Sequence, residues 1–490
     1  MAGIVLFTEV CHGGFGRYAG TYRIATELRD AGYDVQVIEF FTLWSSKELS
    51  KIIHKYITKE TKLVGFSCTF FLSKDLEWGS RLKIANLEVY KSSLFGRTDI
   101  IDVFEYIKLR SPFCKIVVGG ANAWKAEDEA FNNYVDFVVR GQSDSSVVAL
   151  ADHLFNDSKI NVAYKKQTCS IITEQEYPAE NFTTSRIRYQ DNDLIFDNEV
   201  LPIELARGCI FKCSFCSYQL TGKKIWEFNR APELVASDLL DAHNKFGSTG
   251  FMFCDDTYND SVEKVERLHE QFTKLPFDMT FSTYARADMM VSRPHTAPLL
   301  YESGLRSVFF GIETLNHRSG KAVGKGMDPE KLKDGLYKIK ELPGWKNVVT
   351  SSGFITGLPY DTEDTIRATF EWLARSDCPL DSASISALTI SPTSAIGKNM
   401  AKFGYQWDEN GEWYSEWMTE QRAKELAAEF RDSVIRHKPR TRFQFTYFGR
   451  MQNIGWSLED FDNLTYSTEE SDVRKEKLKN IYYEKLLTLA

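Results

Sequence analysis

The sequence predicts an α/β protein with two strand–helix domains and a small C-terminal segment. Short apolar runs alternate with helical segments from residue 4 to 155, and they do so again from 201 to 400. This alternation predicts parallel sheets: a doubly wound, flavodoxin- or Rossmann-like sheet first, and then a partial (β/α) barrel of six repeats. Hydrophobic residues make up 43% of the 490 residues, which is enough to bury the cores of two or three domains.

The same pattern divides the chain into four parts. Residues 1–155 are expected to form the first domain, and residues 156–200 a polar, irregular linker. Residues 201–400 are expected to form the barrel. Residues 401–490 are rich in aromatic side chains, which either close the open side of the barrel around a substrate pocket or form a small packing module.

In the first domain, an apolar run predicts each strand. Strands are expected at Ile4–Thr8, Asp34–Phe40, Leu63–Cys68, Lys115–Val118 and Val135–Val139, with helices at Tyr18–Ala31, Glu48–Ile57 and Ser145–Phe155. Ligands of such sheets bind beyond the carboxyl ends of the strands, where three loops are expected to meet: Glu9–Gly20, Cys68–Leu72 and Gly119–Ala123. The first loop lacks the dinucleotide motif G-x-G-x-x-G, so turn formation and ligand contact both remain open for its glycines.

In the second domain, strands and helices alternate six times. Strands are expected at Leu201–Ala206, Gly250–Cys254, Met279–Tyr284, Ser307–Phe310, Val348–Thr356 and Ser384–Ile390, with helices at Pro232–Phe246, Val262–Leu275, Ala297–Ser303, Pro329–Glu341 and Thr362–Ala374. Polar motifs follow the strands: Asp255-Asp256, Arg286, Glu313 and Gly357-Leu358-Pro359. Because barrels carry their chemistry at the carboxyl ends of the strands, these motifs predict one shared site.

Three cysteines directly follow the first barrel strand. Cys209, Cys213 and Cys216 have the spacing C-x3-C-x2-C. Three thiols on one tight loop cannot all pair locally, so they indicate a metal cluster rather than a disulfide. A cubane cluster needs a ligand at each iron, and three cysteines leave one iron open to a small molecule. The alternative is three chance cysteines on a surface loop.

This cysteine motif after a strand resembles the signature of the radical S-adenosylmethionine (radical SAM) superfamily. The resemblance implies a [4Fe-4S] cluster held by the three cysteines, with SAM on the open iron. It also implies that an electron, delivered by a reductant such as a flavodoxin or ferredoxin, splits SAM to methionine and a 5′-deoxyadenosyl radical that abstracts a hydrogen atom. The cofactors carry this chemistry, and the protein positions them.

The same resemblance implies contacts to SAM. It assigns the methionine amino group to Asp255 and Asp256, the carboxylate or ribose to Arg286, the ribose hydroxyls to Glu313, the adenine to Phe215 and the backbone near Ile355, and a further contact to Tyr218. A carboxylate paired with an ammonium group fits the first assignment. Taken singly, the alternatives are a helix cap for either aspartate, a surface ion pair for Arg286 and turn glycines around Gly357.

The first domain resembles the cobalamin-binding-like domain that precedes many radical SAM enzymes. The strings "LRDAGYDVQVIE", "VGFSCTF", "IVVGGANAW" and "VDFVVRGQSD" carry this resemblance by their order and spacing. It implies cofactor contacts at Cys68, Gly119 and Gly120. The cobalt-ligating motif D-x-H-x-x-G is missing, although the cobalamin-dependent branch usually lacks it too. A cobalamin site and a domain that has kept the fold but lost the ligand therefore both remain open.

Three functions follow from these patterns. The first is cobalamin-dependent methyl transfer to an unactivated carbon, because "FFGIETLNHRSGKAVGKG" and "GFITGLPYDTEDT" resemble the branch that holds such class B methylases. The second is a cobalamin-free cyclase, epimerase or rearrangement enzyme in which Cys254 donates a hydrogen atom. Cys254 could instead be a small buried hydrophobe. The third is a non-catalytic iron–sulfur or corrinoid sensor, against which the complete set of SAM-site residues speaks.

Composition narrows the class of partners. A net charge of −8, from 60 basic and 68 acidic residues, gives no strong nucleic-acid signal. Nine scattered cysteines without a signal peptide fit a reducing cytoplasm. No run of about 18 apolar residues predicts a membrane span. We therefore expect a cytoplasmic enzyme with a small-molecule or peptide substrate.

Overall fold

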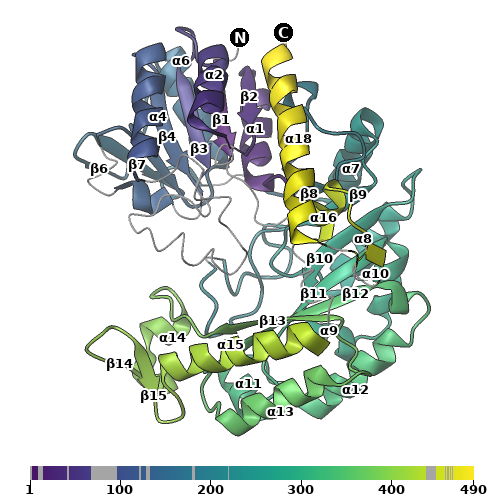
Figure 1. The fold of residues 1–490 in the computed structure, drawn as a ribbon. Coiled ribbons are helices and arrows are strands. Elements are labelled where there is room, and N and C mark those ends of the chain that lie inside the picture. The colour runs from purple at the N-terminus through teal and green to yellow at the C-terminus, as the bar shows by residue number, and fades with distance from the viewer. Residues whose placement is uncertain are drawn as a thin grey trace. The chain divides into compact units, whose positions relative to one another are not determined.

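A computed structural model shows two compact units (Figure 1). The structure describes residues 3–8, 15–40, 44–67, 97–120, 123–127, 133–178, 182–218, 220–437, 448–457, 459–460, 463, 465 and 467–489. The first unit comprises Met1–Pro202, Asp238–Ser248 and Thr468–Ala490, and the second comprises Ile203–Ser237 and Thr249–Ser467. Among the described residues, no helix combines the length and the apolar character that crossing a membrane requires.

The first unit is built on a seven-stranded sheet in the order β2-β1-β3-β4-β5-β7-β6. Its strands are β1 (Ile4–Thr8), β2 (Val35–Ile38), β3 (Leu63–Ser67), β4 (Lys115–Gly119), β5 (Phe137–Arg140), β6 (Tyr164–Lys166) and β7 (Cys169–Thr173). All pair in parallel except β6, which runs antiparallel to β7 at the edge. The order 2-1-3-4-5 is that of a doubly wound sheet whose direction reverses between β1 and β3, so the predicted fold class is confirmed for this unit.

Helices of the first unit include α1 (Ala19–Asp30), α2 (Ser46–Tyr56), α4 (Arg97–Arg110), α6 (Asp144–Asn156) and the C-terminal α18 (Thr468–Thr488). Helix α2 shows why these segments begin where they do. The Ser45 hydroxyl accepts from the backbone N–H of Glu48, and the Glu48 carboxylate accepts from the backbone N–H of Ser45. This capping box pairs two backbone donors that the helix itself leaves free.

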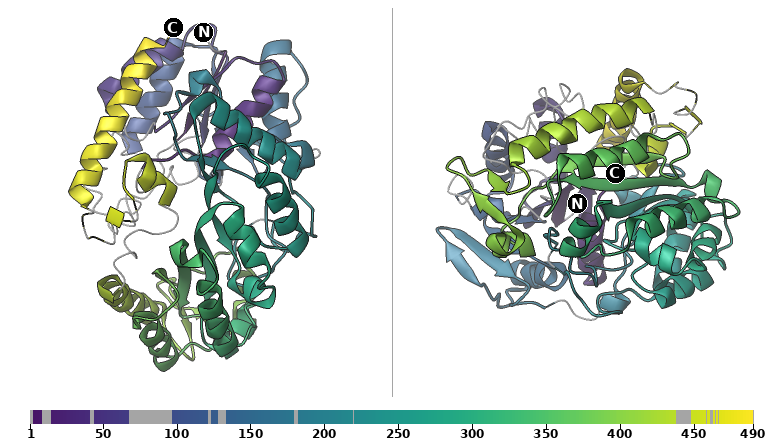
Figure 2. Two further views of the ribbon diagram at one scale, coloured as in Figure 1. Left: turned by 90° about the vertical axis from the view of Figure 1, so that its right-hand side faces the viewer. Right: turned by 90° about the horizontal axis from the view of Figure 1, so that it is seen from below.

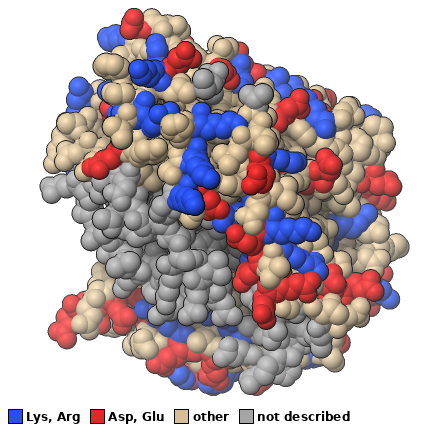
Figure 3. All heavy atoms as spheres, turned by 45° about the horizontal axis from the view of Figure 1, so that its top comes forward, with Lys and Arg blue, Asp and Glu red and all other residues tan. Residues whose placement is uncertain are grey.

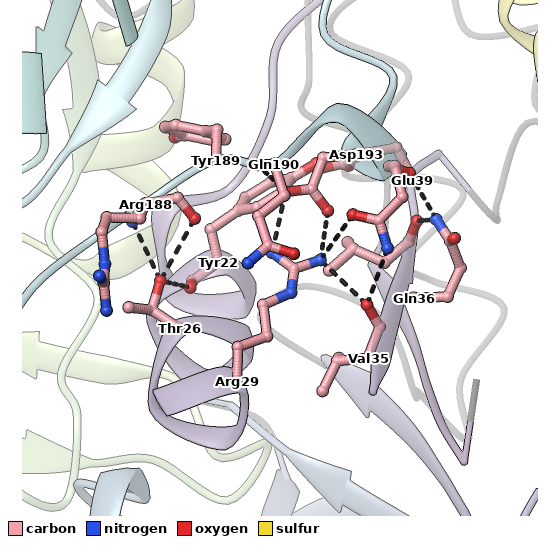
Figure 4. Close-up of polar contacts among 12 residues, drawn as sticks. Tyr22, Thr26, Arg29, Val35, Gln36, Glu39, Arg188, Tyr189, Gln190 and Asp193 are labelled. Carbon is pink, nitrogen blue, oxygen red and sulfur yellow. Dashed lines mark hydrogen bonds and ion pairs between the residues drawn. The ribbon is translucent and has the colours of Figure 1, made fainter. Parts of the chain in front are cut away.

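The segment expected as an irregular linker belongs to the first unit. Its β6–β7 hairpin extends the sheet, and residues 182–200 then lie along α1 and β2. Figure 4 shows this second part: Arg29 donates to both carboxylate oxygens of Asp193, at 2.9 and 2.7 Å, and the Thr26 hydroxyl accepts from the backbone N–H of Arg188. The polar composition that suggests a linker therefore serves specific hydrogen bonds to the domain.

Helix α18 also belongs to the first unit, although the sequence reading groups it with the segment after residue 400. Figures 1 and 2 show it beside the first sheet. Its Tyr482 is fully buried, packs edge-on against Phe40 at a ring-centroid distance of 5.6 Å, and accepts a hydrogen bond from the backbone N–H of Glu39. Apolar and aromatic burial thus joins the two ends of the chain within one core.

A buried ion pair lies next to Tyr482. Arg17 and Glu199 are 2.8 Å apart, with side-chain exposures of 0% and 1%, and Arg17 also donates to the Tyr22 hydroxyl at 2.7 Å. Burial raises the pKa of the neighbouring Glu39 to about 8, so at pH 7 this carboxyl is mainly neutral. Glu199 is therefore the main counter-ion of Arg17.

The second unit holds a six-stranded sheet in the order β13-β12-β11-β10-β9-β8. Its strands are β8 (Leu201–Ile203), β9 (Gly250–Phe253), β10 (Thr280–Ala285), β11 (Leu305–Glu313), β12 (Val349–Thr356) and β13 (Ser382–Ala387). Strands β9 to β13 pair in parallel with their neighbours. Spatial order equals chain order, as in an open (β/α) barrel, so the predicted partial barrel is confirmed.

Five of the helices between these strands lie close to their predicted ranges, and the short helices at Ala287–Ser292 and His317–Val323 are not predicted by the sequence. In chain order, the helices are α7 (Pro232–Phe246), α8 (Val262–Phe272), α9 (Ala287–Ser292), α10 (Thr296–Glu302), α11 (His317–Val323), α12 (Pro329–Lys340) and α13 (Glu363–Ala374). Thr362 caps α13 by accepting from the backbone N–H of Thr365, whereas Asp361 accepts from the backbone N–H of Leu358. Among these helices, α9 and α10 pack against β11, α8 packs against α10, and α12 packs against α9.

The segment after residue 394 contacts this sheet in two places: residues 420–437 pack against β12 and β13, and residues 448–453 contact β9. It contains α14 (Ala395–Lys398), the hairpin β14 (Tyr405–Trp407)–β15 (Trp413–Ser415), α15 (Glu420–His437) and α16 (Phe448–Asn453). The Trp413 indole donates to the Leu388 carbonyl at 2.9 Å, and the Tyr405 hydroxyl donates to the Gly357 carbonyl at 2.7 Å. Trp413 and Tyr405 are buried, whereas Trp407 is 50% exposed, so part of the aromatic set packs on the strands.

The buried ion pair yields a stability prediction. Glu199→Ala leaves the Arg17 charge without its main counter-ion in a dry core, so we expect the free energy of unfolding of the first unit to fall by about 3–5 kcal/mol. Urea denaturation followed by circular dichroism measures this change. The double variant Arg17→Met/Glu199→Leu, which removes both charges, should lose less. A loss below about 1 kcal/mol in Glu199→Ala would contradict the buried-pair assignment.

Candidate functional site

The three cysteines lie on one folded loop after β8. Gly208 opens the loop with φ +73°, and a Cβ at this position would stand 2.3 Å from the Leu220 Cβ, so only glycine fits. The backbone N–H of Cys209 donates to the Leu220 carbonyl at 3.0 Å, and that of Cys216 donates to the Cys213 carbonyl at 3.1 Å. These bonds fold the loop back on itself and fix the spacing of the thiols.

All three thiols are free and partly exposed. Burial raises the pKa of Cys216, and the nearby Cys213, Asp256 and Cys209 raise it further, so these four groups lie close together. In the described part of the chain, no three His, Cys, Asp or Glu side chains converge on a single metal ion. A cubane cluster takes one cysteine per iron.

Of the two aspartates after β9, only Asp256 faces the cysteine loop. Asp255 is 1% exposed, and its Oδ1 accepts from the backbone N–H groups of Leu205 and Ala206. Asp256 accepts from the backbone of Gly208, and burial raises its pKa while Lys223 lowers it. Both aspartates lie beyond the end of β9, so the packing of the loop directs one carboxylate to the backbone and the other toward the cysteines.

Arg286 directly follows β10 and also contacts the cysteine loop. Its side chain is buried, its Nη1 lies 3.5 Å from the Cys213 Sγ, and its guanidinium stacks on the Phe211 ring at 3.8 Å. Its Nε donates to Asp288 at 2.9 Å. The structure therefore brings Arg286 to a cysteine, whereas the family resemblance assigns it to SAM.

Glu313 ends β11 in a strained conformation. Its φ is +68°, which is rare for a residue with a side chain, and the pairing with β12 shifts register here. Lys325 lies 3.9 Å from its carboxylate, and a Cβ on Gly311 would stand 2.9 Å from the same carboxylate. Burial raises the pKa of Glu313, while Lys325 and Arg286 lower it. Strain held in this way is common at binding sites.

The remaining predicted SAM contacts lie around these groups. Ile355, on β12, lines one small cavity together with Glu313, so the two residues predicted to meet adenosine are neighbours. Phe215 is half-buried on the cysteine loop, and Tyr218 is 65% exposed. Cys254 is exposed at the end of β9, so the alternative of a small buried hydrophobe is wrong.

Comparison with known proteins identifies the second unit's core. Residues 203–373 match the radical SAM superfamily. The chain contains a radical SAM domain. This confirms the enzyme class and the two cofactors that such a domain uses, a [4Fe-4S] cluster and SAM.

Relatives extend the likeness beyond the radical SAM domain. An uncharacterised methyltransferase of Pyrococcus horikoshii is 24% identical over 54% of this chain and 57% of its own length. The bacteriochlorophyllide d C-12(1)-methyltransferase of Chlorobaculum tepidum is 23% identical over 53% and 55%. The chain thus spans a little over half the length of these two curated relatives.

One solved structure shares the architecture of nearly the whole chain. TsrM of Kitasatospora setae, a radical SAM methyltransferase solved with cobalamin and a [4Fe-4S] cluster, aligns with a TM-score of 0.67 at 16% identity. The alignment covers 97% of this chain and 100% of TsrM. At this identity the likeness shows the fold, which includes the domain before the radical SAM domain.

The first unit offers a second candidate site at the carboxyl edge of its sheet. Gly119 ends β4 and is half-exposed, and the following Gly120 is exposed, so the chain presents bare backbone here. Cys68 and most of the loop after β1 lie outside the described residues. The sequence Asp241-Ala242-His243 matches only the first three positions of the cobalt-ligating motif D-x-H-x-x-G. His243 lies in α7, and its Nδ1 is 3.3 Å from the Ser248 carbonyl oxygen, so this contact is with the backbone that follows the helix.

Several residues near the site are not predicted by any of the sequence motifs. Lys223 and Lys264 are 8% and 3% exposed, and Lys264 donates to the Thr257 carbonyl at 3.1 Å. Burial lowers the pKa of Lys223, and the like charge of Lys264 lowers it further. Asn316 donates to the Tyr360 carbonyl at 2.9 Å, which ties the loops after β11 and β12 together. Both lysines stand among other charged residues in the sequence, at Lys224 and at Glu263 and Glu266, so no local pattern marks them as buried.

Asp255 yields a pH prediction. Burial raises its pKa to about 7, and its Oδ2 has no partner among the described residues. An unfolded aspartate titrates near pH ~4, so the folded chain binds more protons between pH ~4 and ~7, and stability should fall as pH rises through this window. Asp255→Asn keeps an oxygen that accepts from Leu205 and Ala206, but it cannot ionise. The stability of this variant relative to the wild type should therefore be higher at pH 8 than at pH 5.

Urea midpoints of both proteins at pH 5 and pH 8 check this expectation. Asp408→Asn is the matched control, because Asp408 is exposed and its pKa is lowered by backbone hydrogen bonds, the opposite shift. Parallel pH profiles for Asp255→Asn and the wild type would contradict a neutral Asp255 in the folded protein.

Proposed function

We propose that this protein is a cobalamin-dependent radical SAM methyltransferase that methylates an unactivated carbon of a small molecule or peptide. The observation that carries the proposal is the loop of three free, partly exposed cysteines that Asp256 and Arg286 flank at the carboxyl ends of parallel strands. When bound, the cluster supplies the electron that splits SAM, and cobalamin supplies the methyl group. The remaining work falls to the chain's own side chains.

In this proposal, Cys209, Cys213 and Cys216 hold the cluster, and Asp256 accepts from the SAM amino group. Asp256 suits this role because it lies near Cys216 and beside the buried Lys223, which favours its charged form. The Glu313 carboxylate accepts from the ribose, held in place by its strained backbone and by Lys325. Phe215, Tyr218 and the Ile355 backbone enclose the adenine and exclude water from it.

We assign cobalamin to the first unit. The order of its sheet places the crevice of a doubly wound fold between β1 and β3, and Gly119 and Gly120 leave the neighbouring end of β4 bare. The fold of TsrM and the names of the two curated relatives support methyl transfer. A flavodoxin or ferredoxin would deliver the electron.

We also place the enzyme in the cytoplasm. The described cysteines at positions 114, 169, 209, 213 and 216 are free thiols, which fits a reducing compartment. Nucleic acid is not among the partners we propose, since basic and acidic side chains are interspersed on the face in Figure 3.

The cluster assignment predicts the phenotype of one substitution. Cys213→Ala removes one of three iron ligands, so we expect loss of the cluster and a loss of at least about 100-fold in 5′-deoxyadenosine formation from SAM under reducing conditions. Iron and sulfide analysis and chromatography of the nucleoside products measure both. Ser217→Ala, an exposed change on the same loop, is the control. Normal 5′-deoxyadenosine yield from Cys213→Ala would overturn the proposal.

The cobalamin assignment is tested by corrinoid content. After anaerobic reconstitution with iron, sulfide and hydroxocobalamin, followed by desalting, we expect about one corrinoid per chain, because the first unit keeps the fold and the open strand ends of a cofactor domain. Absorbance spectra measure it. No retained corrinoid, with an intact cluster that still cleaves SAM, would exclude cobalamin-dependent methyl transfer.

The exposed thiol of Cys254 favours one other function, a cobalamin-free cyclase, epimerase or rearrangement enzyme. A thiol at the carboxyl end of β9 can give a hydrogen atom to a substrate radical. In that case Cys254→Ser would still form 5′-deoxyadenosine but would lose the product, whereas a methyltransferase would keep both activities. This contrast separates the two functions.

A further inference from the structure

We propose that Arg286 acts on the cluster rather than on SAM: it donates a hydrogen bond to the Cys213 sulfur and raises the reduction potential of the cluster. This inference rests on the proposed function, because it requires Cys213 to be an iron ligand. The distance from Nη1 to Sγ is 3.5 Å, within the range of a hydrogen bond to sulfur. Hydrogen bonds to the sulfurs are among the factors that set cluster potentials.

The other two nitrogens of Arg286, Nε and Nη2, are already engaged with other groups. Its Nε and Nη2 both donate to the Asp288 carboxylate, and Nη2 also lies 3.4 Å from the Gly324 carbonyl. A two-point contact with the SAM carboxylate would need two neighbouring nitrogens of Arg286, such as Nε and Nη2. Asp288 occupies that pair, which leaves Nη1 for Cys213.

Both the backbone and the guanidinium plane of Arg286 are held in place. Its backbone N–H donates to the Asn259 side-chain oxygen at 2.8 Å, and its carbonyl accepts from the Asn259 side-chain nitrogen at 3.0 Å. The Phe211 ring stacks on the guanidinium at 3.8 Å, and the residue is 4% exposed. Such a group cannot swing toward a ligand without breaking several contacts, so its position at Cys213 is built into the fold.

The contact to Cys209 differs in kind. The Thr257 hydroxyl lies 3.2 Å from the Cys209 Sγ, but it also lies 2.6 Å from the Asp256 carbonyl oxygen. A hydroxyl has one hydrogen, and the shorter contact takes it. In the part of the chain that the structure describes, Arg286 is therefore the charged donor to a cysteine of the loop. A positive charge near the cluster stabilises its reduced state, which carries one more electron.

The test is a redox titration of the reconstituted full-length protein without SAM, followed by electron paramagnetic resonance. Arg286→Gln should shift the cluster midpoint to lower potential at unchanged iron and sulfide content, and Arg286→Lys, which keeps the charge, should shift it less. Arg293→Gln is the matched control, because it removes an exposed arginine at the end of α9 and should leave the midpoint unchanged.

Equilibrium binding of SAM separates this role from the one that the family resemblance assigns. We expect the dissociation constant for SAM to change less than about threefold in Arg286→Gln. An unchanged midpoint, or a loss of SAM affinity without a midpoint shift, would overturn the inference. If Arg286→Gln takes up no iron, the cluster midpoint of Arg286→Lys is compared with that of the wild type instead, and an unchanged midpoint would again overturn the inference. A wild-type protein that forms no cluster would instead refute the proposed function.

Discussion

The hydrogen bonds that Asp255 accepts from Leu205 and Ala206 are the constraint on which the candidate site depends. They join the end of β9 to the segment where the chain leaves β8 and enters the cysteine loop. Asp255 is buried, and its Oδ2 has no partner in the described part of the chain, so the contact is made at an electrostatic cost that appears as a pKa raised to about 7. A polar group held at such a cost fixes the direction in which the loop starts, and with it the position of all three thiols.

Around that loop, the site is assembled from groups that are each held in more than one way. Arg286 is held by Asn259, Asp288 and Phe211. Glu313 is turned toward Lys325 by a left-handed backbone conformation. This arrangement is typical of preorganised sites, where the fold rather than the ligand supplies the energy for ordering the contacts. Under the proposed function, such order would limit side reactions of a radical with water, because a closed site excludes water.

In the first unit, segments that lie far apart in the sequence pack into one core. Arg17 pairs with Glu199, and Arg29 pairs with Asp193. Tyr482 of the last helix packs against Phe40. The segment after the sheet and the end of the chain are therefore parts of this unit rather than connectors.

The sequence by itself determined the kind and order of most strands and helices of the two sheets, because the apolar period of a strand or helix is a local property. It also determined the cluster motif, because three cysteines within eight residues must share one loop. The acidic and basic motifs after the strands were likewise readable, since each directly follows an apolar run. Cys209, Cys213, Cys216, Asp256 and Glu313 were found in this way, and the structure brings them to one unit.

Only the tertiary structure decided which partner each of these groups takes. The sequence treats Asp255 and Asp256 alike, yet one binds backbone and the other faces the thiols, because the direction of a side chain past a strand end depends on how the loop is packed. Arg286 reaches Cys213 across 73 residues of chain. Helix α18 joins the first unit although more than 400 residues separate Tyr482 from Phe40. Contacts over such distances leave no local period in the sequence, so packing alone selects them.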